Sequence, residues 1–138
     1  MTSTHIDWDT LIQAARKARD HAYAPYSGYR VGAALLGDDG RVYAAGNVEN
    51  GIPALSICAE RNAVARAVNA GVTTFRALAV VTASTPPASP CGLCRQTLAE
   101  FVGDLPILRT NLQGERTETS LTELFPEPFV LGREVVVE

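Results

Sequence analysis

Four residues in two short stretches could form a metal site. Cys58 and Glu60 are separated by one residue, and Cys91 and Cys94 by two. Three thiolates can bind one zinc ion and leave the fourth position of its tetrahedron open to water or substrate. A carboxylate beside that open position can accept and deliver protons. We therefore predict a hydrolytic zinc site with Cys58, Cys91 and Cys94 as ligands and Glu60 as the catalytic acid and base.

The cysteines have two alternative interpretations. A closed structural zinc site needs a fourth protein ligand, and the histidines of the chain, His5 and His21, are distant in sequence from both stretches. Buried cysteines that act as small apolar residues are the second alternative. An open site needs only the three ligands that these stretches supply, and three cysteines cannot all form disulfides within one chain. We therefore favour the open site.

An arginine directly follows each stretch. Three thiolates and one zinc ion together carry a net charge of about −1, which weakens the metal as a Lewis acid. Arg61 follows Glu60 and Arg95 follows Cys94. A guanidinium that donates a hydrogen bond to a zinc-bound sulfur withdraws part of this negative charge. Arg61 is therefore expected to support the metal ligands.

Length and composition limit the remaining possibilities. The chain has 138 residues, 46% of them hydrophobic, which fits a single domain over 1–138 with a tail of unknown role at 131–138. A net charge of −3 gives no basic surface for a nucleic-acid polymer. The first residues lack the apolar core of a signal peptide, and no apolar run approaches the roughly 20 residues of a membrane span. We expect a cytoplasmic protein that binds neither membranes nor nucleic-acid polymers.

The spacing of apolar residues predicts the elements that must position the cysteines. Apolar residues three and four positions apart indicate helices, and continuous apolar runs indicate buried strands. The expected helices are Asp7 to Tyr23, Ile57 to Ala70, Cys91 to Val102 and Leu121 to Phe125. The expected strands are Arg30 to Leu36, Arg41 to Gly46, Ala77 to Ala83 and Pro106 to Thr110.

The order of these elements predicts a layered α/β domain that begins with an antiparallel hairpin. Two loops, Asn47 to Ser56 and Ser84 to Pro90, lead into the helices that carry the cysteines. Those helices should pack on one face of the sheet, so that their N-termini converge. Helix N-termini carry partial positive charge and favour thiolates. The polar segment Glu115 to Thr119 shows no strand pattern, and both an edge strand and a disordered tail fit Val135 to Val137.

Both cysteine stretches resemble those of the zinc-dependent cytidine deaminases, specifically the small homotetrameric type with three cysteine ligands. The stretches that carry the resemblance are Cys58 to Arg61 and Pro90 to Gln96, with Ala22 to Ser27, Val31 to Leu36, Asn47 to Asn50 and Thr110 to Gly114 as further similar segments. The similarity extends from the first helix to Phe129. It implies a three-layer α/β/α fold, with a central mixed five-stranded sheet and helices on both faces. It also implies one zinc ion per subunit and Glu60 as the non-ligating acid and base.

The resemblance also implies the residues that hold a nucleoside. Asn47 and Glu49 would bind the 3′-hydroxyl of the ribose, and the backbone of Ala59 would read the pyrimidine edge. Tyr29, where the family usually has Phe, would stack near the base. Phe129 would reach the site of a neighbouring subunit of a homotetramer. Outside this set, Gln96 and Arg61 are expected beside the metal ligands.

The implied activity is hydrolytic deamination of cytidine and 2′-deoxycytidine to uridine and 2′-deoxyuridine, by attack of a zinc-activated water at C4. The resemblance also implies release of ammonia and a role in pyrimidine salvage. One segment departs from the family pattern, which continues after Asn50 with a small residue and then Tyr, whereas this chain has Gly51-Ile52-Pro53. Because of this departure, an alternative activity remains open: deamination of a modified cytosine nucleoside or of a blasticidin-type nucleoside antibiotic. A zinc-stabilised binding module, in which Glu60 only favours a helix start, is the non-enzymatic alternative.

Overall fold

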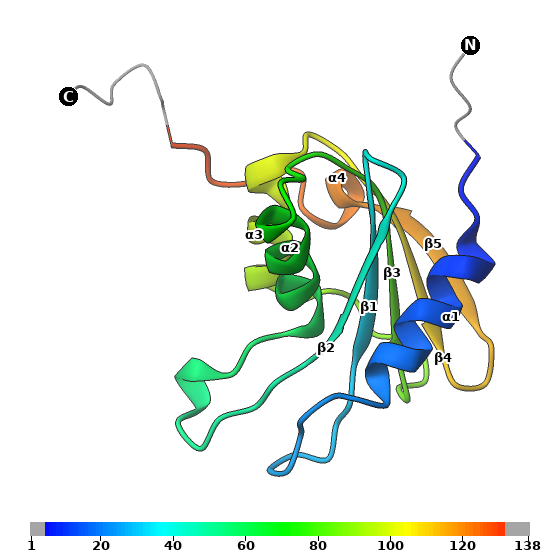
Figure 1. Cartoon of the computed structure of the whole chain (residues 1–138), viewed down its shortest axis with the longest axis vertical. Coiled ribbons are helices and arrows are strands. Elements are labelled where there is room, and N and C mark those ends of the chain that lie inside the picture. The colour runs from blue at the N-terminus through cyan, green and yellow to red at the C-terminus, as the bar shows by residue number, and fades with distance from the viewer. Residues whose placement is uncertain (1–4, 132–138) are drawn as a thin grey trace.

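A five-stranded sheet lies between two layers of helices in the computed structural model, which describes residues 5–131 (Figure 1). The strands are β1 (Gly32–Gly37), β2 (Val42–Gly46), β3 (Phe75–Thr82), β4 (Pro106–Asn111) and β5 (Arg116–Ser120). The helices are α1 (Trp8–Arg19), α2 (Ala59–Asn69), α3 (Gly92–Phe101) and α4 (Leu121–Leu124), and η1 (Pro53–Leu55) is a 3-10 turn. The strand order is β2-β1-β3-β4-β5, with β3 and β4 parallel and the other neighbours antiparallel. The predicted three-layer fold with a mixed five-stranded sheet is confirmed.

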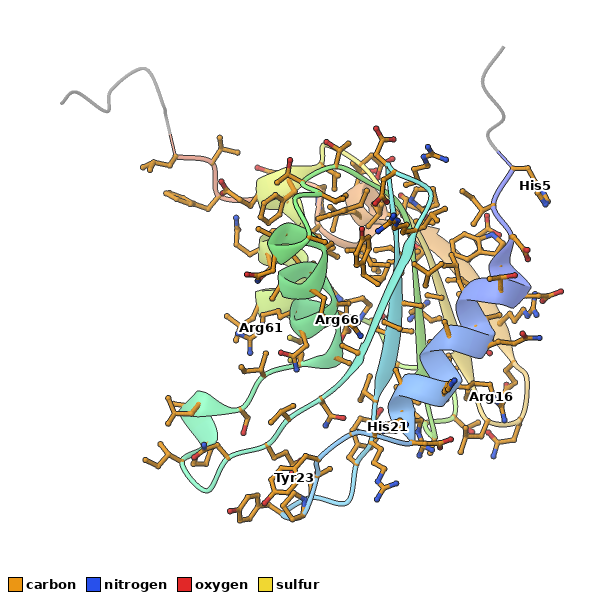
Figure 2. The ribbon with its side chains drawn as sticks, viewed as in Figure 1. His5, Arg16, His21, Tyr23, Arg61 and Arg66 are labelled. Atoms are coloured by element: carbon orange, nitrogen blue, oxygen red, sulfur yellow. The ribbon has the colours of Figure 1, made fainter. Side chains whose placement is uncertain are left out.

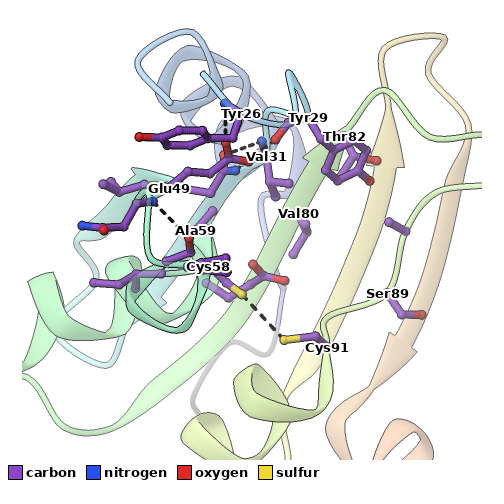
Figure 3. A pocket seen from close by; sticks show the side chains of 18 of the residues that line it. Tyr26, Tyr29, Val31, Glu49, Cys58, Ala59, Val80, Thr82, Ser89 and Cys91 are labelled. Carbon is purple, nitrogen blue, oxygen red and sulfur yellow. Dashed lines mark hydrogen bonds between the residues drawn. The ribbon is translucent and has the colours of Figure 1, made fainter. Parts of the chain in front are cut away.

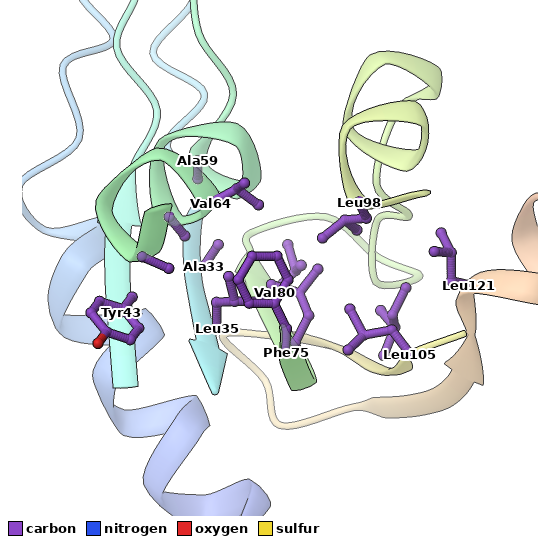
Figure 4. Packing of buried hydrophobic residues seen from close by; sticks show 14 residues of the cluster. Ala33, Leu35, Tyr43, Ala59, Val64, Phe75, Val80, Leu98, Leu105 and Leu121 are labelled. Carbon is purple, nitrogen blue, oxygen red and sulfur yellow. The ribbon is translucent and has the colours of Figure 1, made fainter. Parts of the chain in front are cut away.

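The central strand β3 divides its side chains between two apolar cores. Leu78 and Val80 belong to the core under α2 and α3, where Leu98 is also fully buried (Figure 4). Ala79 and Val81 belong to the opposite core, which α1 covers. A strand that is buried on both faces needs apolar residues at successive positions, which explains the continuous apolar run in the sequence. This arrangement places α2 and α3 together on one face of the sheet, as predicted.

The helices α1 and α2 are shorter than predicted because the residues at their ends pair with another segment. Val48 forms isolated bridges with Tyr23 on one side and with Ile57 on the other. The amides of Val48 and Ile57 donate to each other's carbonyl oxygens at 2.9 and 2.8 Å. These backbone groups are therefore not available for helical hydrogen bonds. Accordingly, α2 begins at Ala59, after Ile57. Helix α1 ends at Arg19, where the amides of Asp20, His21 and Ala22 bond the carbonyl oxygens three residues earlier, before the Tyr23 amide donates to the Asn47 carbonyl oxygen.

The residue pattern alone missed strand β5. The strand pairs antiparallel with β4 at the edge of the sheet, and most of its residues are exposed. An exposed edge strand needs no alternation of apolar residues, so its polar sequence gave no strand signal. The resemblance to the deaminases did imply a fifth strand. Residues 132–138, including Val135 to Val137, lie outside the described residues.

Within residues 5–131, no helix combines the length and the apolar character that a membrane crossing requires.

Gly32 allows α1 to lie directly against β1. A Cβ atom at this position would overlap the carbonyl oxygen of Ala15 and lie 2.8 Å from the Cβ of Arg19. Gly32→Ala is therefore expected to lower the free energy of unfolding by about 3 kcal/mol, since helix and strand must separate. Urea denaturation would measure this change. Gly103→Ala is the matched control, because a Cβ there meets nothing within 4 Å; equal effects of the two substitutions would contradict this packing.

Candidate active site

A cavity of about 480 Å³ opens beside the carboxyl end of β3 (Figure 3). Val80 and Thr82 of β3 line it. Its other walls come from the loop before β1, the segment after β2, the start of α2 and the loop before α3. The segment after β2 runs directly into α2, so four stretches that are distant in sequence, 26–31, 47–60, 80–82 and 88–91, meet around one space. Each contributes polar side chains or thiols to it.

Three sulfur atoms form a tight cluster at this cavity. The Sγ atom of Cys91 lies 3.6 Å from that of Cys58 and 3.5 Å from that of Cys94. All three sulfurs lie within 4.8 Å of one another. Tetrahedral zinc with bonds of about 2.3 Å to sulfur requires sulfurs about 3.8 Å apart. The donor set and its spacing therefore fit one zinc ion held by three thiolates, with one position left for another ligand.

Helix starts bring these cysteines together. Cys58 is the N-cap residue of α2, Cys91 is the N-cap residue of α3, and Cys94 lies in the first turn of α3. Because both helices pack on the same face of the sheet, their N-terminal partial charges converge on the cluster. Within residues 5–131, no histidine belongs to the group, and Figure 2 shows His5 and His21 on the side of α1. The histidines that a closed zinc site would require are therefore elsewhere.

The thiols of Cys58 and Cys94 shift each other's pKa in opposite directions. The pKa of the Cys58 thiol is lowered to about 5, first by a hydrogen bond from Cys94, then by one from Cys91, and then by the Arg61 guanidinium. The pKa of Cys94 is raised, because its proton is shared with the Cys58 sulfur and its side chain is buried. Of these two thiols, Cys58 more readily becomes a thiolate.

Glu60 lies in the first turn of α2 and lines the cavity. Its side chain is buried, and burial raises the pKa of its carboxyl to about 7, with a further rise from the charge of Cys58. A carboxyl with a pKa near neutrality can both accept and release a proton under ordinary conditions. Ala59, which precedes it, is fully buried and also lines the cavity.

The two residues expected to bind ribose also hold the wall of the cavity. The Oδ1 atom of Asn47 accepts a hydrogen bond from the Val31 amide at 2.8 Å, and its Nδ2 donates to the Tyr29 carbonyl oxygen at 3.0 Å. Glu49 accepts hydrogen bonds from the amides of Tyr26 and Ser27 at 3.0 and 3.1 Å. The Ser27 hydroxyl also donates to Glu49.

These bonds leave part of each side chain free. The hydroxyl of Ser27 is the first cause of a lowered pKa for Glu49, which keeps this carboxylate charged. An Asn side chain has two N–H donors and a carboxylate has about four acceptor positions. Asn47 and Glu49 therefore each keep hydrogen-bonding capacity toward the cavity, which both of them line.

The structure places Gln96 away from the metal ligands. Its amide side chain donates to the Phe129 carbonyl oxygen at 2.9 Å and accepts from the Phe129 amide at 3.1 Å. Two positions along a helix correspond to a rotation of about 200°, so Gln96 points away from the side on which Cys94 is buried. Phe129 does not line the cavity of its own chain, and its side chain is 70% exposed.

Arg61 and Arg95 differ in their contacts. Arg95 donates to the carbonyl oxygens of Pro90 and Leu124 at 2.8 and 2.9 Å. It therefore joins the start of α3 to the end of α4. Arg61 donates to the Ser56 carbonyl oxygen at 3.1 Å and lies beside Cys58. Its buried Nε atom has no hydrogen-bond partner within residues 5–131. Of the two arginines, Arg61 has the contacts expected of a residue that supports the metal ligands.

Sequence reasoning missed two side chains of β4 that hold the loop before α3. Arg109 donates from Nη1 to the Ser89 hydroxyl at 2.5 Å, and Asn111 donates to the Ser84 carbonyl oxygen at 3.0 Å. They are two positions apart on one strand, and so lie on the same face of the sheet. A charged residue such as Arg109 is common in strands without such a role, so nothing in the sequence distinguished it. Asn111 falls in the segment Thr110 to Gly114, whose similarity to the deaminases could have indicated it.

The sequence of the chain matches a described family over most of its length. Residues 6–106 match the profile of the cytidine and deoxycytidylate deaminase zinc-binding region. The chain belongs to this family. It is 48% identical over 125 residues to a cytidine deaminase of Sporosarcina psychrophila, an alignment that covers 90% of this chain and 92% of the relative. The match confirms the prediction of a zinc-dependent deaminase and argues against the alternative of a zinc-stabilised binding module.

Comparison with solved structures agrees with this assignment. The crystal structure of cytidine deaminase from Burkholderia pseudomallei superposes with a TM-score of 0.86 and 44% sequence identity, covering 90% of this chain and 100% of that chain. A blasticidin-S deaminase of Bacillus cereus is 29% identical over 106 residues, covering 71% of this chain and 75% of the relative. The greater identity to the cytidine deaminases favours the first of the two predicted deaminase activities.

Replacing Arg61 by Gln is expected to weaken zinc binding and turnover by about 10-fold, because a cation beside the Cys58 thiolate is lost. Competition with a zinc chelator, alongside initial rates, would measure both effects. Arg66→Gln is the matched control, because Arg66 also lies on α2 and donates to a backbone carbonyl oxygen, that of Ala44, at 2.7 Å (Figure 2). Unchanged zinc retention and turnover in Arg61→Gln would show that this arginine has no part in the site.

Proposed function

We propose that the protein hydrolyses cytidine and 2′-deoxycytidine to uridine and 2′-deoxyuridine, with release of ammonia. The observation that carries the proposal is a carboxyl, that of Glu60, which is only 5% exposed and lines one cavity with Cys58 and Cys91, two of the three clustered thiols. A cavity of about 480 Å³ is large enough for a nucleoside. Conversion of a nucleoside amine to a carbonyl group belongs to pyrimidine salvage, and that is the role we assign.

The reaction divides between the metal and Glu60. Zinc, when bound by Cys58, Cys91 and Cys94, supplies Lewis-acid activation of water for attack at C4 of the pyrimidine. Glu60 accepts a proton from that water and protonates N3 of the ring. It then takes the remaining proton of the hydroxyl group added at C4 and delivers it to the amine, which leaves as ammonia while the C4 carbonyl forms. Burial of Glu60 suits it to both directions of transfer, because it brings the pKa of the carboxyl to about 7.

Residues at the other end of the cavity orient the nucleoside. The free donor of Asn47 and the free acceptor positions of Glu49 would hold the 3′-hydroxyl of the ribose. The backbone of Ala59 would read the edge of the pyrimidine, and the ring of Tyr29 would stack near the base. With the ribose held by Asn47 and Glu49 and the base held by Ala59 and Tyr29, C4 of the pyrimidine would lie beside Glu60 and the metal site.

We further propose a cytoplasmic homotetramer built from single deaminase domains of residues 1–138. Apolar side chains that a monomer would expose to water support it, since Phe129, Val130 and Leu131 are 70%, 74% and 62% exposed. In this assembly Phe129 reaches the cavity of a neighbouring subunit. Three thiols without disulfides suit a reducing compartment. Sedimentation velocity would measure the mass of the assembly.

The runner-up substrate is a modified cytosine nucleoside, for which the segment after Asn50 is the reason. Gly51 and Pro53 line the cavity, and a Cβ on Gly51 would lie 3.1 Å from the Tyr26 hydroxyl. Where the family has Tyr, Pro53 offers neither a hydroxyl nor an aromatic ring. The outer part of the cavity can therefore accept substituents that a Tyr would exclude.

Incubation of the zinc-replete protein with cytidine tests the proposal. We expect equimolar ammonia and uridine. An ammonia assay would measure the first product, and the change in ultraviolet absorbance would measure the second. Free cytosine should react far more slowly, because it lacks the ribose that Asn47 and Glu49 would hold. Turnover of N4-substituted cytidines but not of cytidine, with zinc bound, would favour the runner-up.

A further inference from the structure

One hydrogen bond joins a wall of the cavity to the loop after β3. Tyr29 lies in the loop before β1 and lines the cavity (Figure 3). Its hydroxyl lies 2.5 Å from the Ser84 hydroxyl. Ser84 lies in the loop after β3, 55 residues later in the chain. Ser84 itself does not line the cavity. The Ser84 hydroxyl therefore reaches the cavity lining through its bond to Tyr29.

Hydrogen bonds of its backbone fix the position of Ser84. Its amide donates to the Thr82 hydroxyl at 3.1 Å, and its carbonyl oxygen accepts from Asn111 Nδ2 at 3.0 Å. Asn111 is fully buried, and its side chain also bonds the Glu115 carboxylate and the amides of Gln113 and Glu115. A buried amide with all its partners present has one favourable orientation. Ser84 is therefore anchored to the sheet through β4.

The backbone of Tyr29 is also held in place. Its amide donates to the Ser27 hydroxyl at 2.9 Å, and its carbonyl oxygen accepts from Asn47 Nδ2 at 3.0 Å. These bonds fix the main chain but leave the ring free to rotate. The ring is 41% exposed, so packing alone restrains it weakly. The hydroxyl bond to Ser84 is the contact that fixes the ring.

We propose that Ser84 is a positioning residue that holds the Tyr29 ring in the orientation that binds the pyrimidine. The inference rests on the proposed function, because it assigns the base to the Tyr29 side of the cavity. Without the Ser84 hydroxyl, substrate binding must stop the rotation of the ring, and that cost lowers affinity. Chemistry at C4 depends on Glu60 and the metal ligands, which the change does not touch. KM should therefore rise while kcat stays nearly constant.

The test is a double-mutant cycle on the KM for cytidine. Ser84→Ala and Tyr29→Phe should each raise KM about 5-fold with kcat within about 2-fold, as expected for one hydrogen bond. The double variant should also show about a 5-fold rise and not about 25-fold, because both changes remove the same bond. Ser84→Thr, which keeps the hydroxyl, should restore KM to within about 2-fold of the original.

Tyr43→Phe is the matched control. It also removes a tyrosine hydroxyl bond, that to Asp39 at 2.6 Å, but it lies on β2 outside the cavity lining. Its KM should be unchanged even if its melting temperature falls. An unchanged KM in Ser84→Ala, or multiplying effects in the double variant, would overturn the positioning role alone. A zinc-loaded wild-type protein that does not deaminate cytidine would overturn the proposed function and this role together.

Discussion

Glu60→Gln is expected to lower kcat for cytidine by at least about 10³-fold while zinc stays bound. Gln has nearly the same size as Glu but cannot accept or release a proton in this pH range, so both proton transfers lose their carrier. The fold should persist, because Glu60 lies at a helix start and Gln fills the same buried space. Initial rates together with zinc content would measure the two effects separately.

Glu118→Gln makes the same chemical change at an exposed position on β5. Its rate should equal that of the unchanged protein, which would assign any loss in Glu60→Gln to the position and not to the lost charge. If Glu60→Gln retained more than about a tenth of the original kcat, another group would have to carry the protons. Thr82 lines the cavity and is buried, but a hydroxyl has no pKa suited to that role.

Cys91→Ser is expected to remove both zinc and turnover. Cys91 is the exposed member of the cluster, so its replacement disturbs the core less than replacement of buried Cys94 would. A hydroxyl is a far weaker zinc ligand than a thiolate, and two thiolates alone hold the ion loosely. Zinc should fall from about one ion per chain to traces after dialysis against a chelator, and the melting temperature should fall as well.

Chelation of the unchanged protein provides the control. Its turnover should vanish with the metal and return when zinc is added, because Cys58, Cys91 and Cys94 are still present. The Cys91→Ser protein should not recover under the same conditions. Full zinc content and activity in this variant would show that the cluster is not the metal site of the enzyme. Elemental analysis and initial rates decide between these outcomes.

The segment Gly51-Ile52-Pro53 shows how a change of sequence is absorbed locally. Ile52 is 61% exposed, and its amide donates to the Asn50 side chain at 2.9 Å. Pro53 begins a short 3-10 turn, where its missing N–H costs nothing. The chain therefore keeps its path to Cys58 despite the changed residues. What changes is the surface that this segment presents to the cavity.

The elements that the sequence predicted well are those whose signal is local. Apolar runs predicted β3 and β4 to within two residues at each end, and the helix carrying Cys91 and Cys94 to within one. Helix ends were predicted less well, because Val48 takes Tyr23 and Ile57 into backbone pairing. No local pattern indicates that pairing, since it joins segments that meet only in the folded chain.

The sequence by itself determined the chemistry of the site. Cys58, Glu60, Cys91 and Cys94 have the residue types and spacing of an open zinc site, and two helix starts suffice to present them. Only the tertiary structure decided how the cavity walls are held. The hydrogen bonds from Asn47 to Val31, from Asn111 to Ser84 and between Tyr29 and Ser84 span 16, 27 and 55 residues. Such partners become neighbours only when the sheet is assembled, because nothing in either local segment specifies the other.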